Sequence, residues 1–185
     1  DTAGPMLIVG AGVQGRAHME VFAQVLGVRR FRIASRSRAS AQALVDHAQA
    51  LGLQAEVAPD ADAALADCSL VVTCTPASGV VLRASPRADA FIAAVGAFTP
   101  QMVELAPALC RHVADHGRIV VDTREAEHEA GDLLQAGINV AALPSLRDVV
   151  RAGRRGGRGP VLFKSCGWAG WDLAAARLAM REWSG

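Results

Sequence analysis

The pattern Gly-x-Gly-x-x-Gly at residues 10–15 constrains the fold of this chain more than any other feature of its sequence. It follows the apolar run Met6-Leu7-Ile8-Val9 and precedes residues 17–26, whose apolar side chains recur at helical spacing. A second short apolar run, 31–34, completes a strand–helix–strand unit. Because the phosphate-binding turn of dinucleotide-binding domains has this order, the pattern predicts an α/β domain that binds a dinucleotide.

Each glycine of the turn has a separate physical reason to be glycine. Gly10 permits a tight turn, Gly12 lets the backbone approach a pyrophosphate, and Gly15 lets the helix pack closely on the strand. The free N–H groups and the dipole at the helix N-terminus then form an anion site. The alternative is that the glycine turn has only a structural role and binds no phosphate.

The remaining apolar runs extend this unit into a larger sheet. Strands are expected at 6–9, 31–34, 55–57, 70–75, 91–95 and 119–121, and helices at 39–51, 62–67, 125–135 and 169–183. Several runs are continuously apolar, which suits strands covered on both faces. We therefore expect a Rossmann-type doubly wound, mostly parallel sheet with helices on both faces. A polar loop and a late apolar triplet, 161–163, follow the sixth strand.

Composition excludes several classes of function. The chain is 51% hydrophobic and 20% charged with a formal net charge of +1, so no overall field attracts nucleic acid or anionic membranes. No run approaches the roughly 18 apolar residues of a membrane span, and the first residues lack the basic start of a secretory signal. A cytoplasmic protein is expected. The four cysteines form no C-x-x-C pair and are expected to be reduced and buried.

The residues after the second strand indicate which dinucleotide is preferred. The chain reads Ser35-Arg36-Ser37-Arg38 there, and the first acid after this turn is Asp46. A carboxylate at this place would accept the ribose 2′-hydroxyl of NAD(H), whereas guanidinium and hydroxyl groups suit the 2′-phosphate of NADP(H). We therefore expect NADP(H) to be preferred, NAD(H) to remain possible, and Arg36 to be the main phosphate ligand. A solvated basic turn is the alternative.

Further cofactor contacts are expected beyond the carboxyl ends of the later strands, where ligands of doubly wound sheets bind. These candidates are Thr73, Cys74, Thr75, Pro76, Val95, Gly96 and Asp122. Among them, Thr75 and Val95 could contact the nicotinamide ribose and ring. Packing at the strand end is the alternative for both residues.

Three other segments carry polar side chains with ordinary explanations. On the helix expected at 125–135, His128 and Asp132 would share one face, as a catalytic pair or as a solvated acidic helix start. His112 and His116 have helical metal-ligand spacing, but no H-E-x-x-H accompanies them, and no metal is expected. Residues 151–159, rich in Arg and Gly but without aromatics, read as a solvated loop rather than an RNA-binding segment.

Six blocks along the chain together resemble the ornithine cyclodeaminase/mu-crystallin family. They are Gly-Ala-Gly-Val-Gln-Gly-Arg-Ala-His (10–18), Ser-Arg-Ser (35–37), Val-Val-Thr-Cys-Thr-Pro (71–76), Ala-Val-Gly-Ala-Phe-Thr-Pro-Gln-Met-Val-Glu-Leu (94–105), Glu-Ala-Gly-Asp-Leu (129–133) and Phe-Lys-Ser-Cys-Gly (163–167). Their order covers nearly the whole chain. The resemblance implies a Rossmann domain that binds NAD(P), paired in the family with a second domain for substrate binding and dimerisation.

The resemblance also assigns residues to the cofactor and to the chemistry. The dinucleotide would be lined by Ala11, Val13, Gln14, Ser35, Arg36, Ser37, Ser40, Thr75, Pro76, Val95 and Ser165. Asp132 matches the aspartate of the family's Glu-x-Gly-Asp block and would act as acid/base beside the nicotinamide.

Two reactions occur in this family, and the basic turn discriminates between them. Cyclodeaminases convert ornithine to proline and ammonia while recycling NAD, whereas ketimine reductases reduce a cyclic C=N bond with NAD(P)H. Because Ser35-Arg36-Ser37 is similar to the turn of NADPH-consuming reductases, a reductase of Δ1-pyrroline-2-carboxylate or Δ1-piperideine-2-carboxylate is favoured. A cyclodeaminase and a non-catalytic NADP(H)-binding protein are the alternatives. Residues 1–185 are expected to be the cofactor domain of a homodimer, without the family's N-terminal substrate domain.

Overall fold

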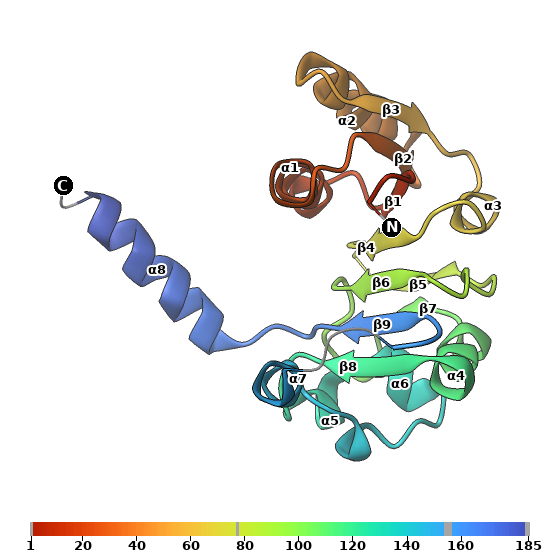
Figure 1. The fold of residues 1–185 in the computed structure, drawn as a ribbon, viewed down its shortest axis with the longest axis vertical. Coiled ribbons are helices and arrows are strands. Elements are labelled where there is room, and N and C mark those ends of the chain that lie inside the picture. Colours follow the sequence, from red (N-terminus) through yellow and green to blue (C-terminus); the bar gives the residue numbers. More distant parts are fainter. Residues whose placement is uncertain (1, 77, 154–156, 184–185) are drawn as a thin grey trace.

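A seven-stranded parallel sheet forms the centre of the molecule in a computed structural model that describes residues 2–76, 78–153 and 157–183. Its strands are β1 (Met6–Val9), β2 (Arg30–Ala34), β3 (Gln54–Val57), β4 (Leu70–Thr73), β6 (Phe91–Ala94), β8 (Arg118–Val121) and β9 (Val161–Lys164). They lie in the order β3-β2-β1-β4-β6-β9-β8 (Figure 1), and every neighbouring pair is parallel. The doubly wound parallel sheet is therefore confirmed.

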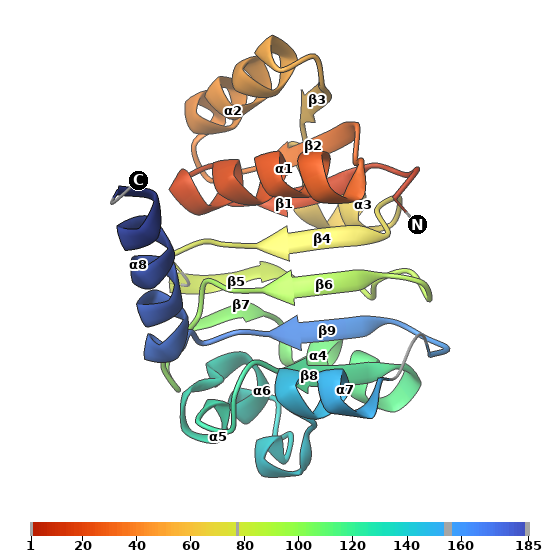
Figure 2. The ribbon, with the colours of Figure 1, turned by 60° about the vertical axis from the view of Figure 1, so that its left-hand side comes forward.

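The strand order places a topological switch between β1 and β4. The chain builds outward from β1 to β3 at one edge, then returns to pair β4 with the other side of β1. Because all seven strands are parallel, their carboxyl ends share one edge of the sheet, as the arrowheads of β4, β6 and β9 show in Figure 2. Ligands of such sheets bind at this edge, outside the switch point.

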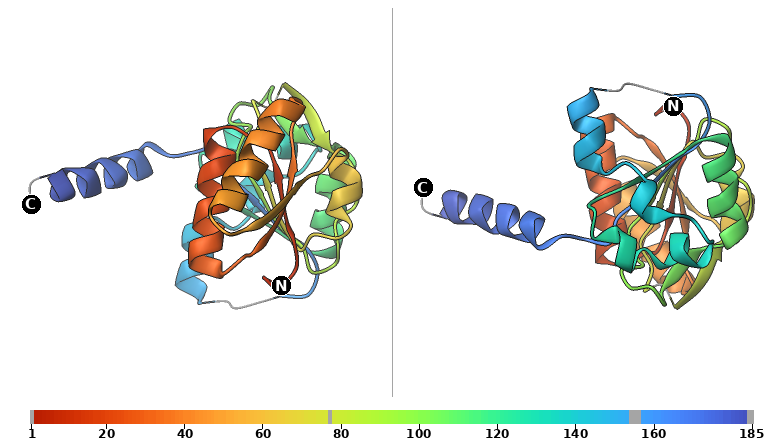
Figure 3. Two further views of the ribbon diagram at one scale, coloured as in Figure 1. Left: turned by 90° about the horizontal axis from the view of Figure 1, so that it is seen from above. Right: turned by 90° about the horizontal axis from the view of Figure 1, so that it is seen from below.

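Helices cover both faces of the sheet, as its apolar strands require. The first two, α1 (Val13–Leu26) and α2 (Arg38–Ala50), pack on the face that receives Met6 and Ile8. On the opposite face, α3 (Ala61–Leu65) and α4 (Pro107–His116) pack with Leu7 and Val9. Figure 3 shows the sheet between these two layers. Alternate residues of β1 thus enter separate cores, and all four are buried.

Strand β9 is the main departure from the expected topology. The late apolar triplet becomes a central strand inserted between β6 and β8, with Leu162 and Lys164 fully buried. Strand β8, the sixth run in the sequence, therefore lies at the edge. Local apolarity predicts that such runs are strands, but their order depends on contacts between distant residues.

Two further strands and two short helices occur where none was expected. Strands β5 (Ser78–Leu82) and β7 (Val103–Leu105) form a small parallel sheet, and β4 ends at Thr73 rather than at residue 75. The expected polar loop contains the 3₁₀ turn η1 (Val140–Ala142) and α7 (Leu146–Ala152), which begins with a Ser145–Asp148 capping box. Residues 154–156 of the Arg/Gly-rich segment lie outside the described residues.

The continuous helix expected over 125–135 is wrong. The chain instead forms α5 (Ala126–Glu129) and α6 (Gly131–Gln135), separated at Ala130 by a non-helical backbone with φ −75° and ψ 72°. Gly131 packs directly on the loop before β7, and a Cβ atom there would lie 2.2 Å from the carbonyl oxygen of Met102. This close approach explains why residue 131 is a glycine at the start of α6. His128 and Asp132 consequently do not share one helix face.

The last helix, α8 (Ala169–Trp183), agrees with the sequence in its bounds. It leaves the carboxyl edge after β9 and projects away from the rest of the domain (Figures 1 and 3). Its apolar side chains are exposed, including Leu178 at 60% and Met180 at 66%. Within the described ranges, no helix is long and apolar enough to span a membrane.

Candidate dinucleotide site at the carboxyl edge

The glycine turn between β1 and α1 is held by contacts that require Gly10 and Gly15. Gly10 has φ +117°, and its N–H donates to the carbonyl of Ala34 at 2.9 Å. A Cβ atom on Gly15 would lie 2.0 Å from the carbonyl oxygen of Gly10. Real Cβ atoms do not approach other atoms so closely, so a larger residue at Gly15 would require the backbone of the turn to shift.

Gly12 is different, because nothing in the fold requires a glycine there. Its backbone is extended at φ −91° and ψ −164°, and a Cβ atom would meet nothing within 4 Å. Gly12 is also the N-cap of α1, a 14-residue helix, and no side-chain cap satisfies the first N–H groups of this helix. The open cradle and these free donors fit a pyrophosphate. Neighbouring Ala11, Val13 and Gln14 lie at the surface beside it.

The turn after β2 presents two unpaired cations. Arg36 and Arg38 are exposed, and within the described residues neither forms an ion pair. Arg32 on β2 itself differs from these two arginines because it forms an ion pair, with its guanidinium 2.6 Å from a carboxylate oxygen of Asp67. That hydrogen bond, with the negative charge of Asp67, raises the pKa of Arg32. The turn therefore keeps a free positive charge at the carboxyl edge.

The serines of this turn have structural contacts of their own. The Ser37 side chain caps α2 by accepting the N–H of Ser40 at 3.2 Å. The half-buried Ser35 side chain accepts the N–H of Ser37 at 3.4 Å. Local capping therefore explains Ser37 without a ligand, while its exposed hydroxyl stays accessible to one.

The ends of β4 and β6 lie next along the same edge. Thr73 is fully buried and cannot contact a ligand directly, whereas Thr75, Val95 and Gly96 are half-buried and Pro76 is exposed. Cys74 lies against the glycine turn, with its thiol 3.4 Å from the carbonyl oxygen of Gly10. Burial raises the pKa of the Cys74 thiol to about 12, so it is a neutral packing group.

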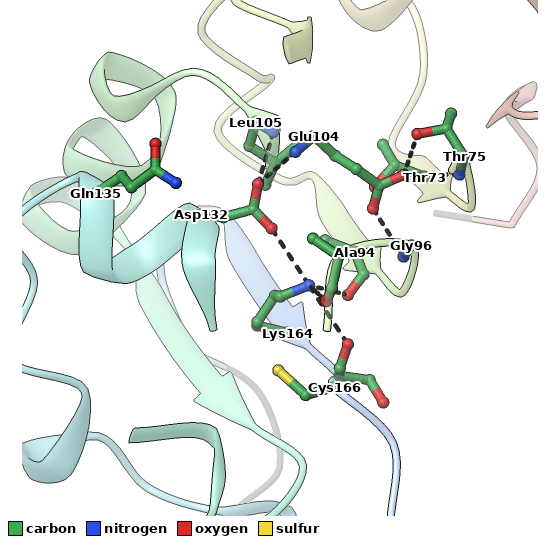
Figure 4. A network of polar contacts seen from close by, with 12 residues as sticks. Thr73, Thr75, Ala94, Gly96, Glu104, Leu105, Asp132, Gln135, Lys164 and Cys166 are labelled. Carbon is green, nitrogen blue, oxygen red and sulfur yellow. Dashed lines mark hydrogen bonds and ion pairs between the residues drawn. The ribbon is translucent and has the colours of Figure 1, made fainter. Parts of the chain in front are cut away.

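Glu104 of β7 joins these two strand ends through a buried carboxylate (Figure 4). Its Oε2 accepts the hydroxyl of Thr73 at 2.9 Å and the N–H of Gly96 at 2.8 Å. Its Oε1 accepts both the N–H and the hydroxyl of Thr75, at 2.7 and 2.8 Å. Four donors thus converge on one carboxylate, which suits an ionised acceptor.

Asp132 and Lys164 continue this arrangement inside the domain, and both side chains are fully buried. Asp132 Oδ1 accepts the N–H groups of Glu104 and Leu105 at 2.6 and 2.8 Å. Its Oδ2 lies 3.2 Å from Lys164 Nζ, off the alignment of a hydrogen bond. Lys164 Nζ donates to the carbonyl of Ala97 at 2.5 Å. We refer to Thr73, Thr75, Gly96, Glu104, Asp132 and Lys164 as the Glu104 network.

The position of Asp132 can be compared with the acid/base role that the family resemblance implies for it. Its residue exposure is 1%, and both carboxylate oxygens face the protein interior. His128, by contrast, is exposed on α5 and lies 3.1 Å from Glu127. The role of Asp132 as a proton donor stays a prediction, and its contacts favour a structural part.

Ser165 follows β9 and is oriented by Asp122 at the end of β8. Its hydroxyl donates to Asp122 Oδ2 at 3.0 Å, and the same oxygen accepts the N–H groups of Cys166 and Gly167 at 2.7 and 2.9 Å. Asp122, a candidate ligand from the sequence, is therefore an anchor for the turn that leads to α8. Ser165 itself is 9% exposed.

Sequence reasoning found the glycine turn but missed Glu104 and Lys164. Two signals could have pointed to them: Lys164 is the only lysine of the chain and follows an apolar run, and Glu104 lies between Val103 and Leu105. A charge inside an apolar strand needs a buried partner. The His112 and His116 rings stack 4.5 Å apart, and the described residues contain no group of three metal-ligating side chains.

The parallel sheet, the open glycine turn and the strand ends at one edge define a Rossmann-type dinucleotide-binding domain. The model of the ornithine cyclodeaminase/mu-crystallin family matches residues 1–185, and the chain belongs to this family.

Individual relatives agree with this assignment. The chain is 37% identical over 176 residues to Delta(1)-pyrroline-2-carboxylate reductase 2 of Burkholderia ambifaria, covering 94% of this chain and 54% of that protein. It is 31% identical over 182 residues to the ketimine reductase mu-crystallin of Mus musculus, covering 97% and 55% of the two chains. The chain thus spans about half the length of the curated relatives it matches.

Solved structures show the same fold. The Delta(1)-pyrroline-2-carboxylate reductase of Thermococcus litoralis, in complex with NADH and L-proline, superposes with a TM-score of 0.84 at 24% identity and covers 96% of this chain and 57% of its own. The iminosuccinate reductase of Paracoccus denitrificans, in complex with NAD⁺, gives a TM-score of 0.82 at 26% identity, with 95% and 55% covered.

Proposed function

We propose that this chain is the cofactor-binding part of an NADPH-dependent reductase of cyclic 2-imino acids. The substrate would be Δ1-pyrroline-2-carboxylate or Δ1-piperideine-2-carboxylate, and the product L-proline or L-pipecolate. The similarity to the Delta(1)-pyrroline-2-carboxylate reductase of Burkholderia ambifaria supports this substrate class. A homodimer and a cytoplasmic location are part of the same proposal for the full-length protein.

The free cations of the β2 turn carry the choice of cofactor. Arg36 and Arg38 are exposed, and no carboxylate neutralises them among the described residues. A 2′-phosphate on the adenosine ribose would gain charge-assisted hydrogen bonds from them, whereas a plain 2′-hydroxyl would leave both charges without a partner. The similar solved structures named above hold NADH or NAD⁺, so the proposed preference for NADPH rests on this chain's own Arg36 and Arg38.

Each group of residues has a distinct task in this proposal. The N–H groups at the start of α1 would hold the pyrophosphate, and Ser35, Arg36 and Ser37 the 2′-phosphate. Thr75, Val95 and Ser165 would orient the nicotinamide side. When bound, NADPH supplies the hydride that reduces the imine carbon.

The contribution of these residues is positioning rather than covalent chemistry, because orientation supplies much of the rate of such transfers. The proton that accompanies the hydride goes to the imine nitrogen. We keep Asp132 in the proposal as a residue that acts through its backbone contacts with Glu104 and Leu105.

Turnover of the full-length gene product tests the proposal. With Δ1-pyrroline-2-carboxylate, NADPH should be consumed in proportion to the L-proline formed, and NADH should support a lower kcat/KM. Release of ammonia from ornithine without added NADPH would identify a cyclodeaminase instead. Dinucleotide binding without turnover of either compound would identify a non-catalytic binding protein.

A further inference from the structure

The proposed function assigns no task to the Glu104 carboxylate, although it contacts the strand ends proposed to face the nicotinamide half of the site. We propose that Glu104 is a positioning residue for the nicotinamide half of the bound dinucleotide. It does so by fixing the backbone after β4 and β6. This inference rests on the proposed function, because it assumes that the dinucleotide lies along the carboxyl edge.

The Glu104 carboxylate accepts hydrogen bonds just beyond the point where the pairing between β4 and β6 ends. Strands β4 and β6 are in register up to Thr73 and Ala94, and the N–H of Val95 still donates to the carbonyl of Thr73 at 2.9 Å. The next donor, the N–H of Gly96, turns to Glu104 Oε2 at 2.8 Å. On the neighbouring strand, the N–H of Thr75 donates to Glu104 Oε1 at 2.7 Å. One side chain thus replaces the missing hydrogen bonds of the sheet at its ligand-facing edge.

Glu104 is itself held in place from behind. Asp132 accepts the backbone N–H groups of Glu104 and Leu105, and Lys164 lies 3.2 Å from the other oxygen of Asp132. Lys164 also donates to the carbonyl of Ala97, the residue after Gly96. The contacts therefore form a closed path that begins and ends at the β6 strand end, and its side chains are buried (Figure 4).

The arrangement separates the two halves of the predicted site. Gly10–Gly15 and Arg36 follow β1 and β2, and none of the contacts given above joins them to the Glu104 carboxylate. A change at Glu104 should therefore move Thr75 and Gly96 while it leaves the pyrophosphate and adenosine subsites intact. Gly96 is also sterically tied to Glu104, since an added Cβ would lie 2.4 Å from Glu104 Oε1.

Calorimetric titration of the 185-residue chain with two compounds tests this role. NADPH carries the nicotinamide, whereas adenosine 2′,5′-bisphosphate carries only the adenosine end. In Glu104→Gln, the amide NH₂ would face N–H and hydroxyl donors in place of an acceptor. We expect NADPH to bind about tenfold more weakly and the bisphosphate to bind within about twofold of the unchanged chain.

Asp62→Asn is the matched control. Asp62 also holds a strand end through two backbone N–H groups, those of Arg83 and Ala84, at 2.6 and 2.9 Å. It belongs to α3 and contacts none of the predicted ligand-binding residues through these bonds. Its substitution should leave the affinities for both compounds unchanged.

A second variant decides the case if Glu104→Gln does not fold. Thr73→Val removes one donor to Glu104 at a side chain with no exposed surface, so the substitution alters the Glu104 contacts without changing any surface that a ligand could touch. A loss confined to NADPH supports the positioning role. Equal losses for both compounds, or no loss in either variant that folds, overturn it. If the unchanged chain binds neither compound, the proposed function fails instead.

Discussion

The two ends of the candidate site are built on opposite principles. The glycine-turn region (residues 6–50) offers backbone N–H groups and exposed cations, and the groups proposed to bind the phosphates lie at its surface. The Glu104 network does the reverse, because it buries two carboxylates and one ammonium group to hold a short stretch of backbone in place. In the proposed site, the region that binds phosphates leaves its donors exposed, whereas the region that aligns the nicotinamide ring is held by buried contacts.

The two regions should differ most in how much a substitution lowers stability, and the largest loss is expected for Lys164→Met in the Glu104 network. Removal of the ammonium leaves Asp132 buried without its counter-charge, which should lower the free energy of unfolding by about 3–5 kcal/mol. Denaturation in urea, followed by circular dichroism, measures the loss. Asp132→Asn in the same chain should recover part of it, because the amide oxygen can still accept the N–H groups of Glu104 and Leu105. A loss below about 0.5 kcal/mol, as at ordinary surface sites, would contradict the buried pairing.

A smaller effect on stability is expected within the glycine-turn region, where two identical substitutions should differ. Gly15→Ala places a Cβ 2.0 Å from the carbonyl oxygen of Gly10 and should cost about 1–3 kcal/mol of unfolding free energy. Gly12→Ala meets nothing within 4 Å and should leave stability unchanged. The same urea titration compares them.

NADPH binding should reveal an effect of Gly12→Ala that stability does not. Gly12→Ala places a methyl group in the open cradle, so it should weaken NADPH binding although the fold is intact. Full NADPH affinity in a folded Gly12→Ala chain would show that the pyrophosphate does not approach Gly12.

These two regions also differ in how far the sequence could predict them. Gly10, Gly12 and Gly15 form a local pattern between a strand and a helix, so their turn was predicted correctly. The contacts of Glu104 join residues 8 to 31 positions apart, and no local period encodes them. For the same reason the central position of β9 was not foreseen, although its apolar residues were recognised.

The break between α5 and α6 has a similar cause. Helical spacing continues through 125–135, but the backbone leaves the helix at Ala130, and Gly131 packs against the carbonyl of Met102. Tertiary contacts of this kind decide a helix boundary against local propensity. The break also determines the surroundings of Asp132, because residues 131–133 of α6 are buried and its carboxylate contacts the N–H of Glu104 and the ammonium of Lys164.

The smallest effect on stability is expected at Ser37, where a cap and a ligand contact are predicted for the same side chain. Ser37→Ala removes the acceptor for the N–H of Ser40 and should lower the unfolding free energy by about 1 kcal/mol without ligand. Saturating NADPH should widen the difference if the hydroxyl also binds the phosphate. An unchanged difference in thermal unfolding with and without NADPH would limit Ser37 to its capping role.

The most direct test of the whole account is calorimetric titration of the unchanged chain and of Arg36→Ala with NADPH and NADH. The unchanged chain should bind NADPH more tightly than NADH. In Arg36→Ala most of that preference should disappear while NADH affinity stays the same, because only the 2′-phosphate loses its exposed partner. Equal affinity for the two dinucleotides in the unchanged chain, or an undiminished preference in the variant, would contradict it.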